Sequence, residues 1–235
     1  MRCVKTNPVS INLIRLTLVS SILLLLVSGS FNEAVVRTVG RNPSGPALKL
    51  ETYLHNWIDQ RRSRATAERP YPAFIIVSEG GGIRAAYWTS TLLASLQDHD
   101  SKFLDHILAL SGVSGGSVGV SIFAAMAHEV HNKGTMPQCR IQGGLEECAR
   151  SIGRSDFLAA PLASMLLAEP MERVTRLLGE QDRAVALERS LERAWKNTMG
   201  DDLFAQTLEL SVGSEVALLL NATEATNGSR YACFF

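Results

Sequence analysis

The chain has 235 residues, of which 46% are hydrophobic and 20% charged, a composition that supports a buried core and argues against global disorder. Its 23 Lys and Arg residues balance 23 Asp and Glu residues. Nucleic-acid-binding domains usually carry a basic excess, so a formal net charge of zero indicates no nucleic-acid partner.

The first thirty residues have the layout of an export signal. Residues 1–15 carry three basic side chains and no acidic one, residues 16–27 (LTLVSSILLLLV) are uncharged, and SGS follows. A helix over this uncharged run would rise about 18 Å, less than the roughly 30 Å hydrocarbon core of a bilayer. Segment 1–30 is therefore a signal peptide, a retained membrane anchor or a buried helix. The first two alternatives place the rest of the chain outside the cytoplasm.

Residues 31–69 are expected to contain a linker and an amphipathic helix. The breaker NPSGP occupies residues 42–46. After it, apolar residues recur at helical spacing at Leu50, Tyr53, Leu54, Trp57 and Ile58. This helix would dock on the following domain or lie at a membrane surface.

Residues 70–235 are expected to form one α/β domain. Apolar runs at 73–78, 106–111 and 215–223 predict buried strands, and TNG before SRYACFF predicts a turn into a partner strand. Helices are expected at 84–97, with Ala85, Trp88, Leu92 and Leu96 on one face, from Ser117 onward, and in two or three segments between 156 and 199. A polar loop is expected from about 131 to 153. Alternating strands and helices predict a layered fold with a mostly parallel central sheet flanked by helices.

The cysteines leave one question open. Cys139 and Cys148 flank the polar stretch RIQGGLEE and could close a small disulfide loop in an exported domain, or they could be two unrelated thiols. Their spacing fits no metal site, and no acidic loop has calcium-binding spacing. No metal is expected.

The residues Gly112-Val113-Ser114-Gly115-Gly116 fit the pattern G-x-S-x-G between a predicted strand and a predicted helix. A serine on such a tight strand-to-helix turn projects its hydroxyl above the sheet edge. The helix that starts at Gly115 would direct its free amides at the same point, which favours developing negative charge. The pattern therefore indicates a nucleophile elbow with Ser114 as nucleophile, or else a plain structural turn.

A glycine triplet, Gly80-Gly81-Gly82, lies between the first predicted strand and its helix. Together with Ala85 it also fits G-x-G-x-x-A, the dinucleotide-binding fingerprint. That fingerprint requires an acidic residue at the end of the second strand, but the second apolar run ends in Ser111 and continues into the serine turn. No phosphate-binding G-x-x-x-x-G-K-[ST] occurs either, so no cofactor is expected.

The two glycine motifs occur about 32 residues apart, and EGGGIRAAYW followed by SGVSGGS resembles the patatin-like phospholipases, a family of lipid acyl hydrolases. Members carry D-G-G-G-x-R-G as an oxyanion loop, G-x-S-x-G as the elbow, and a later D-G-G or D-G-A that supplies the base. The stretch LLLNATEATNGSRYACFF is also similar to a strand pair of that family. The resemblance covers roughly Pro70 to Phe235, the N-terminal part of such a domain.

The resemblance implies a Ser–Asp dyad. Ser114 would attack the ester carbonyl, an aspartate would take its proton, and an acyl-enzyme would form and be hydrolysed. Amides of Gly80, Gly81 and Gly82 would bind the oxyanion, and Arg84 would hold the loop or meet a phosphate or acyl oxygen. The implied substrate is a phospholipid or another acyl-ester lipid at a membrane surface.

Three positions depart from the family pattern. Glu79 replaces the first aspartate, Ala85 replaces the last glycine, and no D-G-[GA] occurs in the 235 residues. The general base is therefore unassigned, and we expect a partial hydrolase domain, incomplete at the C-terminus. Asp156, Asp182, Asp201 and Asp202 are expected to be caps or surface charges. A non-catalytic lipid-binding module is the alternative function, and a hydrolase with a catalytic His is disfavoured because the five histidines lie outside any motif.

Overall fold

A computed structural model describes residues 15–21, 49–66, 68–133, 139, 143–168, 183–201, 204, 216–224 and 226–234, with backbone only at 129–133, 233 and 234. The chain divides into two compact units. One comprises Met1–Arg37 with Leu158–Glu188, and the other comprises Thr38–Phe157 with Arg189–Phe235. The candidate motifs all lie in the second unit.

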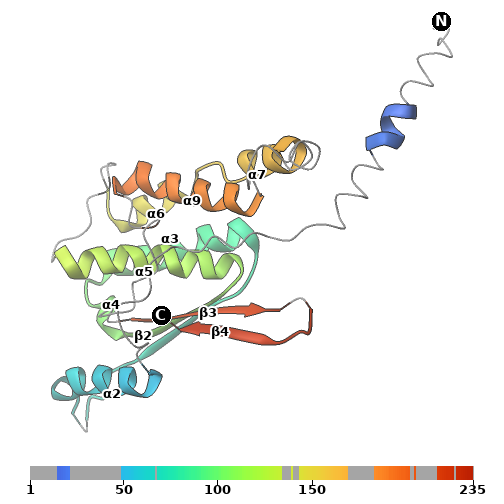
Figure 1. Cartoon of the computed structure of the whole chain (residues 1–235). Helices are drawn as coiled ribbons and strands as arrows, with labels where there is room; N and C mark the ends of the chain where they lie inside the picture. Colours follow the sequence, from blue (N-terminus) through green and yellow to red (C-terminus); the bar gives the residue numbers. More distant parts are fainter. Residues whose placement is uncertain are drawn as a thin grey trace, which may run out of the picture. The chain divides into compact units, whose positions relative to one another are not determined.

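The described residues of this second unit form a four-stranded sheet with the strand order β1-β2-β3-β4 (Figure 1). The strands are β1 (Phe74–Ser78), β2 (Ile107–Val113), β3 (Ala217–Thr223) and β4 (Arg230–Phe234). β2 pairs in parallel with β1 and with β3, whereas β4 is antiparallel to β3. The chain is thus an α/β protein with a mixed, mostly parallel open sheet, as the sequence predicts at this level.

Two long helices follow the first two strands and pack together on one side of the sheet. They are α3 (Gly82–His99) and α5 (Gly115–Lys133), and the short α4 (Phe103–His106) leads into β2. The other side of the sheet carries α2 (Leu50–Arg61), which a 3-10 turn, Arg62–Arg64, extends (Figure 1). The β1–α3–β2 connection is therefore a parallel crossover with its helix on the face opposite α2.

The main core lies between the sheet and α3 and α5. Its largest fully buried side chains include Phe123 and Met126 of α5 and Leu110 of β2. Trp195, from α9 (Arg183–Met199), is also fully buried, and its indole Nε1 donates a 2.7 Å hydrogen bond to the Asp201 carboxylate. Asp201 is therefore a structural acceptor.

The helix predicted near Tyr53 docks on the sheet through its aromatic side chains. The Tyr53 hydroxyl donates to the Leu108 carbonyl at 2.6 Å and accepts from the Ala217 amide at 3.0 Å. The Trp57 indole donates to the Ile107 carbonyl at 3.2 Å. Helix α2 thus bridges the amino ends of β2 and β3, and the docked alternative is confirmed.

The prediction that the first strand is buried is wrong. β1 is the edge of the described sheet, and the side chains of Ile75 and Val77 are 63% and 68% exposed. Both lie on the face that carries α2, but the buried aromatic residues of α2 pack on β2 and β3. An apolar run has the same composition at an edge as in the centre of a sheet, which is why the sequence misleads here.

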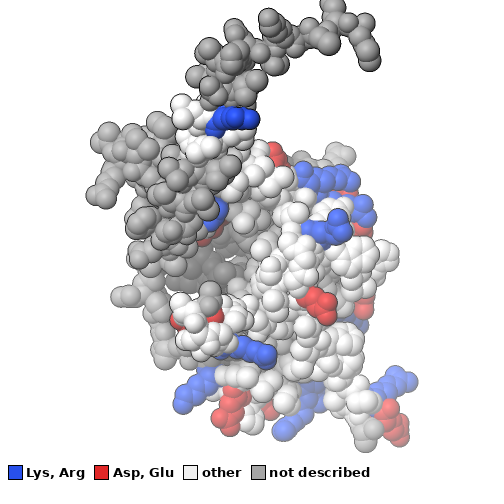
Figure 2. All heavy atoms as spheres, turned by 90° about the vertical axis from the view of Figure 1, so that its right-hand side faces the viewer, with Lys and Arg blue, Asp and Glu red and all other residues white. Residues whose placement is uncertain are grey.

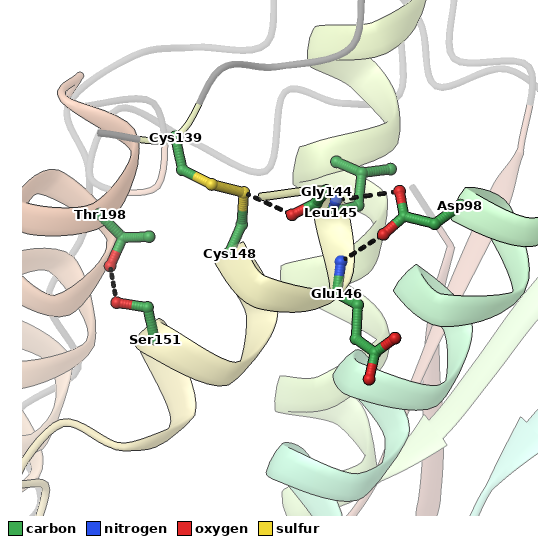
Figure 3. Close-up of a disulfide and its surroundings, with 8 residues drawn as sticks. All are labelled: Asp98, Cys139, Gly144, Leu145, Glu146, Cys148, Ser151 and Thr198. Carbon is green, nitrogen blue, oxygen red and sulfur yellow. Dashed lines mark hydrogen bonds between the residues drawn. A yellow bond between two sulfur atoms is a disulfide. The ribbon is translucent and has the colours of Figure 1, made fainter. Parts of the chain in front are cut away.

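The predicted polar loop at 131–153 is also wrong in its second half, which forms α6 (Leu145–Gly153). Leu145, Cys148, Ala149 and Ile152 are buried along one face of this helix. Its start is capped by Asp98 at the end of α3, whose carboxylate accepts from the amides of Leu145 (2.9 Å) and Glu146 (2.8 Å; Figure 3). Polar residues on the other face conceal the helix in the sequence.

The sequence leaves open whether Cys139 and Cys148 form a disulfide or are two unrelated thiols. Cys139 and Cys148 form a disulfide with a Cα–Cα distance of 5.8 Å (Figure 3). Cys148 is fully buried on α6, next to the contact that this helix makes with the last turn of α9 through Ser151 and Thr198. The disulfide therefore links Cys139 to the buried face of α6.

The first unit is described in part. Residues 15–21 are helical and exposed, and the other residues of segment 1–30 lie outside the described part of the chain. Its helices include α7 (Ala159–Ala163) and the π-helical η2 (Ser164–Ala168). Asp182 of this unit and Asp202 of the second unit lie outside the described residues. No helix among the described residues is long and apolar enough to cross a membrane.

Candidate active site

The two glycine motifs meet at one edge of the sheet. β1 and β2 are parallel neighbours, and Ser78 at the end of β1 pairs with Gly112 near the end of β2. The glycine triplet follows Ser78 and the serine turn follows Val113, so both turns leave the same carboxyl edge. Open α/β sheets place their ligand sites at this edge.

Ser114 has a strained backbone at the turn between β2 and α5. Its φ of 54° makes it the only non-glycine residue with a positive φ in the described part of the chain. Such a conformation costs a non-glycine residue about 1–3 kcal/mol and persists only where the surrounding structure enforces it. The side chain is exposed. The predicted tight strand-to-helix turn is confirmed, with the serine at its apex.

Two elbow glycines leave no room for a side chain. A Cβ on Gly112 would lie 2.6 Å from the Cα and amide nitrogen of Ser117 in the first turn of α5. A Cβ on Gly116 would lie 2.5 Å from the carbonyl oxygen of Glu79 and 2.6 Å from that of Ser78. Real Cβ atoms essentially never approach other atoms this closely, so these contacts explain why glycine occupies both positions.

The glycine triplet lies directly against the serine turn. A Cβ on Gly115 would lie 2.6 Å from the carbonyl carbon and 2.8 Å from the amide nitrogen of Gly82, which itself has a φ of 59°. A Cβ on Gly80 would lie 3.4 Å from the Cβ of Ser114 and 4.0 Å from its Oγ. The structure thus brings together the predicted nucleophile and the predicted oxyanion loop.

Two helix N-termini converge beside Ser114, because α3 begins at Gly82 and α5 begins at Gly115. The first amides of each helix have no partner within the helix, and the partial positive charge of each helix is concentrated there. Both fields favour negative charge near the Ser114 hydroxyl. An alkoxide or a tetrahedral oxyanion would be stabilised at this point.

A hydrogen-bonded pair of hydroxyl groups, which the sequence does not reveal, links the strand before the triplet to α3. The Oγ of Ser78 and the Oγ1 of Thr89 on α3 are 2.6 Å apart in a hydrogen bond, and both side chains are buried. A Cβ on Gly119 of α5 would lie 2.7 Å from the Cβ of Thr89, so α5 packs closely over this pair. The pair connects the end of β1 with the middle of α3.

No family model, curated protein or solved structure matches this chain.

Arg84 lies in the first turn of α3, two residues after the triplet, and its side chain is exposed. It forms no hydrogen bond or ion pair within the described part of the chain. No described contact therefore supports the expectation that Arg84 holds the glycine loop. Its guanidinium remains accessible to an anionic group beside the site.

No carboxylate of the described residues is hydrogen-bonded to Ser114. Glu79 is exposed beside the triplet, Asp98 caps α6, and Asp201 accepts from Trp195. Asp105 forms an exposed ion pair with Arg64 at 3.2 Å. Within this same part of the chain, no three or more His, Cys, Asp or Glu residues are placed to hold a metal ion. The described part of the site thus brings the predicted nucleophile and the predicted amide loop together, and no general base is assigned.

An exposed apolar stripe runs along α3 away from the triplet. Trp88, Leu92 and Leu96 follow Arg84 at intervals of one helical turn, and their side chains are 66%, 44% and 41% exposed. The opposite face of α3, which includes Ala86, Leu93 and Ala94, is the buried one. The sequence places these three residues on one face of the helix, and the structure turns that face outward.

Proposed function

We propose that this chain carries the acyl-transfer site of a serine lipid acyl hydrolase of the patatin-like type, in a layered fold of that family. The observation that carries the proposal is the close approach of the glycine triplet to Ser114. Ser114 stands at a strained, exposed turn, and the Gly80 Cα faces its hydroxyl closely enough that a Cβ there would lie 4.0 Å from Oγ. A nucleophile beside a loop of free amides is the arrangement that acyl transfer requires.

The reaction follows from these positions. The Ser114 oxygen attacks the acyl carbonyl carbon and its proton passes to a general base. The carbonyl π electrons move to oxygen, and amides from the triplet of Gly80, Gly81 and Gly82 bind this oxyanion. Collapse of the tetrahedral intermediate expels the alcohol, which takes up the proton, and water then releases the acid from the acyl-enzyme. One oxyanion donor is typically worth roughly 2.7–4 kcal/mol, which accounts for a loop dedicated to amides.

The stripe on α3 supports a lipid rather than a small soluble ester as substrate. A tryptophan and two leucines lie exposed along the helix that begins at the site, and Arg84 lies at the start of this row. Indole rings favour membrane–water interfaces, and an arginine is suited to a phosphate oxygen. On the face shown in Figure 2, the described basic and acidic side chains are interspersed, with uncharged areas between them. The proposed location is a membrane surface outside the cytoplasm.

A second function, lipid binding without turnover, is favoured by one observation. The 235 residues contain no D-G-[GA], and no described carboxylate is hydrogen-bonded to Ser114. A serine without a base would react slowly even in a well-formed amide loop. Such a module would bind acyl groups through the same surface and release them unchanged.

The test is covalent labelling by a fluorophosphonate probe, compared among the wild-type chain, Ser114→Ala and Ser117→Ala. Ser117 is the matched control because it lies one turn further along α5 and its hydroxyl is buried without a partner. Labelling of the wild type and Ser117→Ala but not of Ser114→Ala is expected. Equal labelling of all three chains, or none, would refute an acyl-transfer site.

A second measurement separates the two functions. Release of fatty acid from vesicles of phosphatidylcholine and phosphatidylglycerol is followed together with co-sedimentation of the protein with those vesicles. Ser114-dependent release supports the hydrolase. Co-sedimentation with no release supports the binding module, and the absence of both contradicts a lipid substrate.

A further inference from the structure

We infer that Asn221 is a positioning residue for the serine turn, through two side-chain hydrogen bonds to the strand that precedes Ser114. Only one part of the inference, that Asn221 affects the reactivity of Ser114, rests on the proposed function. Its structural part, that Asn221 maintains the strained turn, stands independently. The sequence gives no role to Asn221 beyond membership of a strand.

The contacts are specific. The Asn221 side-chain nitrogen donates to the Ser111 hydroxyl at 2.9 Å and to the Gly112 carbonyl at 3.0 Å. A carboxamide NH2 group has two hydrogens, so this geometry can use both on the elbow strand. An aspartate at this position could accept from the Ser111 hydroxyl, but at neutral pH its ionised carboxylate could not donate to the Gly112 carbonyl.

The register explains why an asparagine is placed here. Asn221 of β3 pairs with Val113 of β2, and this is the last pair between the two strands before β2 leaves the sheet. The backbone ladder between these strands ends at this point, and the Asn221 amide adds side-chain bonds where the ladder stops. Asparagine is depleted in strands, so a polar side chain within the apolar run ALLLNAT requires such a reason.

Gly112 is consequently held from two sides. One face of its Cα lies against Ser117 of α5, where a Cβ would clash, and its carbonyl oxygen accepts from Asn221. The conformation of Ser114 begins two residues later, with φ at 54°. Because a left-handed serine relaxes unless its neighbours prevent it, a fixed Gly112 peptide is part of what maintains the turn. Removing the Asn221 amide frees that peptide on the β3 side.

Asn221 therefore acts on the reaction through the backbone. Its loss would displace the Ser114 hydroxyl relative to the triplet, and misplacement of a reacting atom by about 1 Å can cost roughly 100-fold in rate. We expect Asn221→Asp to slow acylation of Ser114 by fluorophosphonate about 10- to 100-fold at pH 8. Because a protonated carboxyl donates one hydrogen bond, this deficit should shrink as the pH falls toward 4.

The matched control is Asn227→Asp, which makes the same chemical change in the turn between β3 and β4. Asn227 is exposed, and it donates to Glu224 and accepts from the Ser229 amide. Its acylation rate should equal that of the wild type at every pH. Provided that the wild-type chain is labelled, two results would overturn the inference. One is an acylation rate of Asn221→Asp equal to that of the wild type, and the other is a slower rate whose ratio to the wild type does not change with pH.

A thermal measurement tests the same inference without any activity. If the Asn221 amide maintains the strained turn, its removal lets Ser114 relax, and the strain recovered offsets part of the lost hydrogen bonding. Asn221→Ala should therefore lower Tm less in the chain with Ser114 than in the chain that also carries Ser114→Gly, where no strain can be recovered. Equal losses of Tm in the two backgrounds overturn the inference.

The outcomes distinguish the two proposals. A wild-type chain that is not labelled refutes the proposed function, and the thermal cycle still decides the role of Asn221. If Asn221→Ala does not fold, Ser111→Ala, which removes one of the two hydrogen bonds, takes the place of the Asn221 variants in both experiments. Ser111→Ala should slow the acylation of Ser114, and its Tm loss should be smaller with Ser114 than with Ser114→Gly, both by less than for the Asn221 variants. If Ser111→Ala changes neither measurement in this way, the inference is overturned.

Discussion

The peptide of Gly82 lies against the Cα of Gly115, so closely that a Cβ there would lie 2.6 Å from the Gly82 carbonyl carbon. These two glycines come from different motifs, and their contact places the amide loop beside the serine turn. A backbone-to-backbone contact of this kind has no flexible side chain that could move aside. The geometry of the site depends on the absence of one methyl group.

Gly115→Ala should therefore destabilise the whole second unit. Overpacking typically costs 1–3 kcal/mol and occasionally more, and here the atoms in the way are backbone atoms. The free energy of unfolding, measured by urea denaturation, should fall by at least about 2 kcal/mol. A variant with wild-type stability would contradict the described contact.

Gly80→Ala is the matched comparison, because its Cβ would meet only ordinary van der Waals distances. Its nearest neighbour would be the Ser114 Cβ at 3.4 Å, followed by the Val113 carbonyl oxygen at 3.6 Å and the Ser114 Oγ at 4.0 Å. We expect a free energy of unfolding within about 0.5 kcal/mol of the wild type, together with slower fluorophosphonate labelling of Ser114. A loss of stability as large as that of Gly115→Ala would show that the two sites do not differ as described.

The backbone of Ser114 gives a prediction that is independent of catalysis. Its φ of 54° is readily adopted by glycine and costs other residues roughly 1–2 kcal/mol. Ser114→Gly should therefore be more stable than Ser114→Ala, by about 1 kcal/mol after allowing for the greater unfolded-state entropy of glycine. Thermal unfolding of both variants checks this, and an alanine variant equal to or more stable than the glycine variant would contradict the strained turn.

The sequence predicts the parts of the site that local patterns encode. An apolar run followed by glycines and a helical segment occurs twice, and the parallel pairing of β1 with β2 then brings both turns to one edge. The sequence does not reveal which strand lies at the edge, so the exposure of Ile75 is unexpected. The same limit applies to contacts distant in sequence, such as the Asp98 cap of α6 and the Asn221 amide beside Gly112, because their partners lie on other elements.

The disulfide between Cys139 and Cys148 is expected to stabilise the fold by closing a short loop. Cys139 and Cys148 are nine residues apart, and in the chain-entropy account closing a loop of this size stabilises the fold by about 2–3 kcal/mol. Reduction of the wild-type chain should lower its Tm, and the double variant Cys139→Ala with Cys148→Ala should show a similarly low Tm in the absence of reductant. Adding reductant should not change the double variant, and any further fall of its Tm would locate the effect elsewhere.

The turn between β3 and β4 predicts a dependence of stability on pH. The pKa of Glu224 is lowered from its ordinary value, first by the hydrogen bond from the Thr226 hydroxyl and then by those from Tyr231 and Asn227. A carboxyl group whose pKa is lower in the folded state stabilises the fold above its unfolded pKa of about 4.3, and this contribution disappears as pH falls through the folded pKa.

Wild-type Tm should accordingly exceed the Tm of Glu224→Gln at pH 6–7, and the difference should shrink as the pH falls below about 4. Thr226→Ala removes the largest cause of the lowered pKa and should reduce this pH dependence while leaving the carboxylate in place. Differential scanning calorimetry between pH 2.5 and 7 gives the comparison. A Tm difference between wild type and Glu224→Gln that stays constant, or grows toward low pH, would show that the Glu224 carboxylate does not gain its hydrogen bonds on folding.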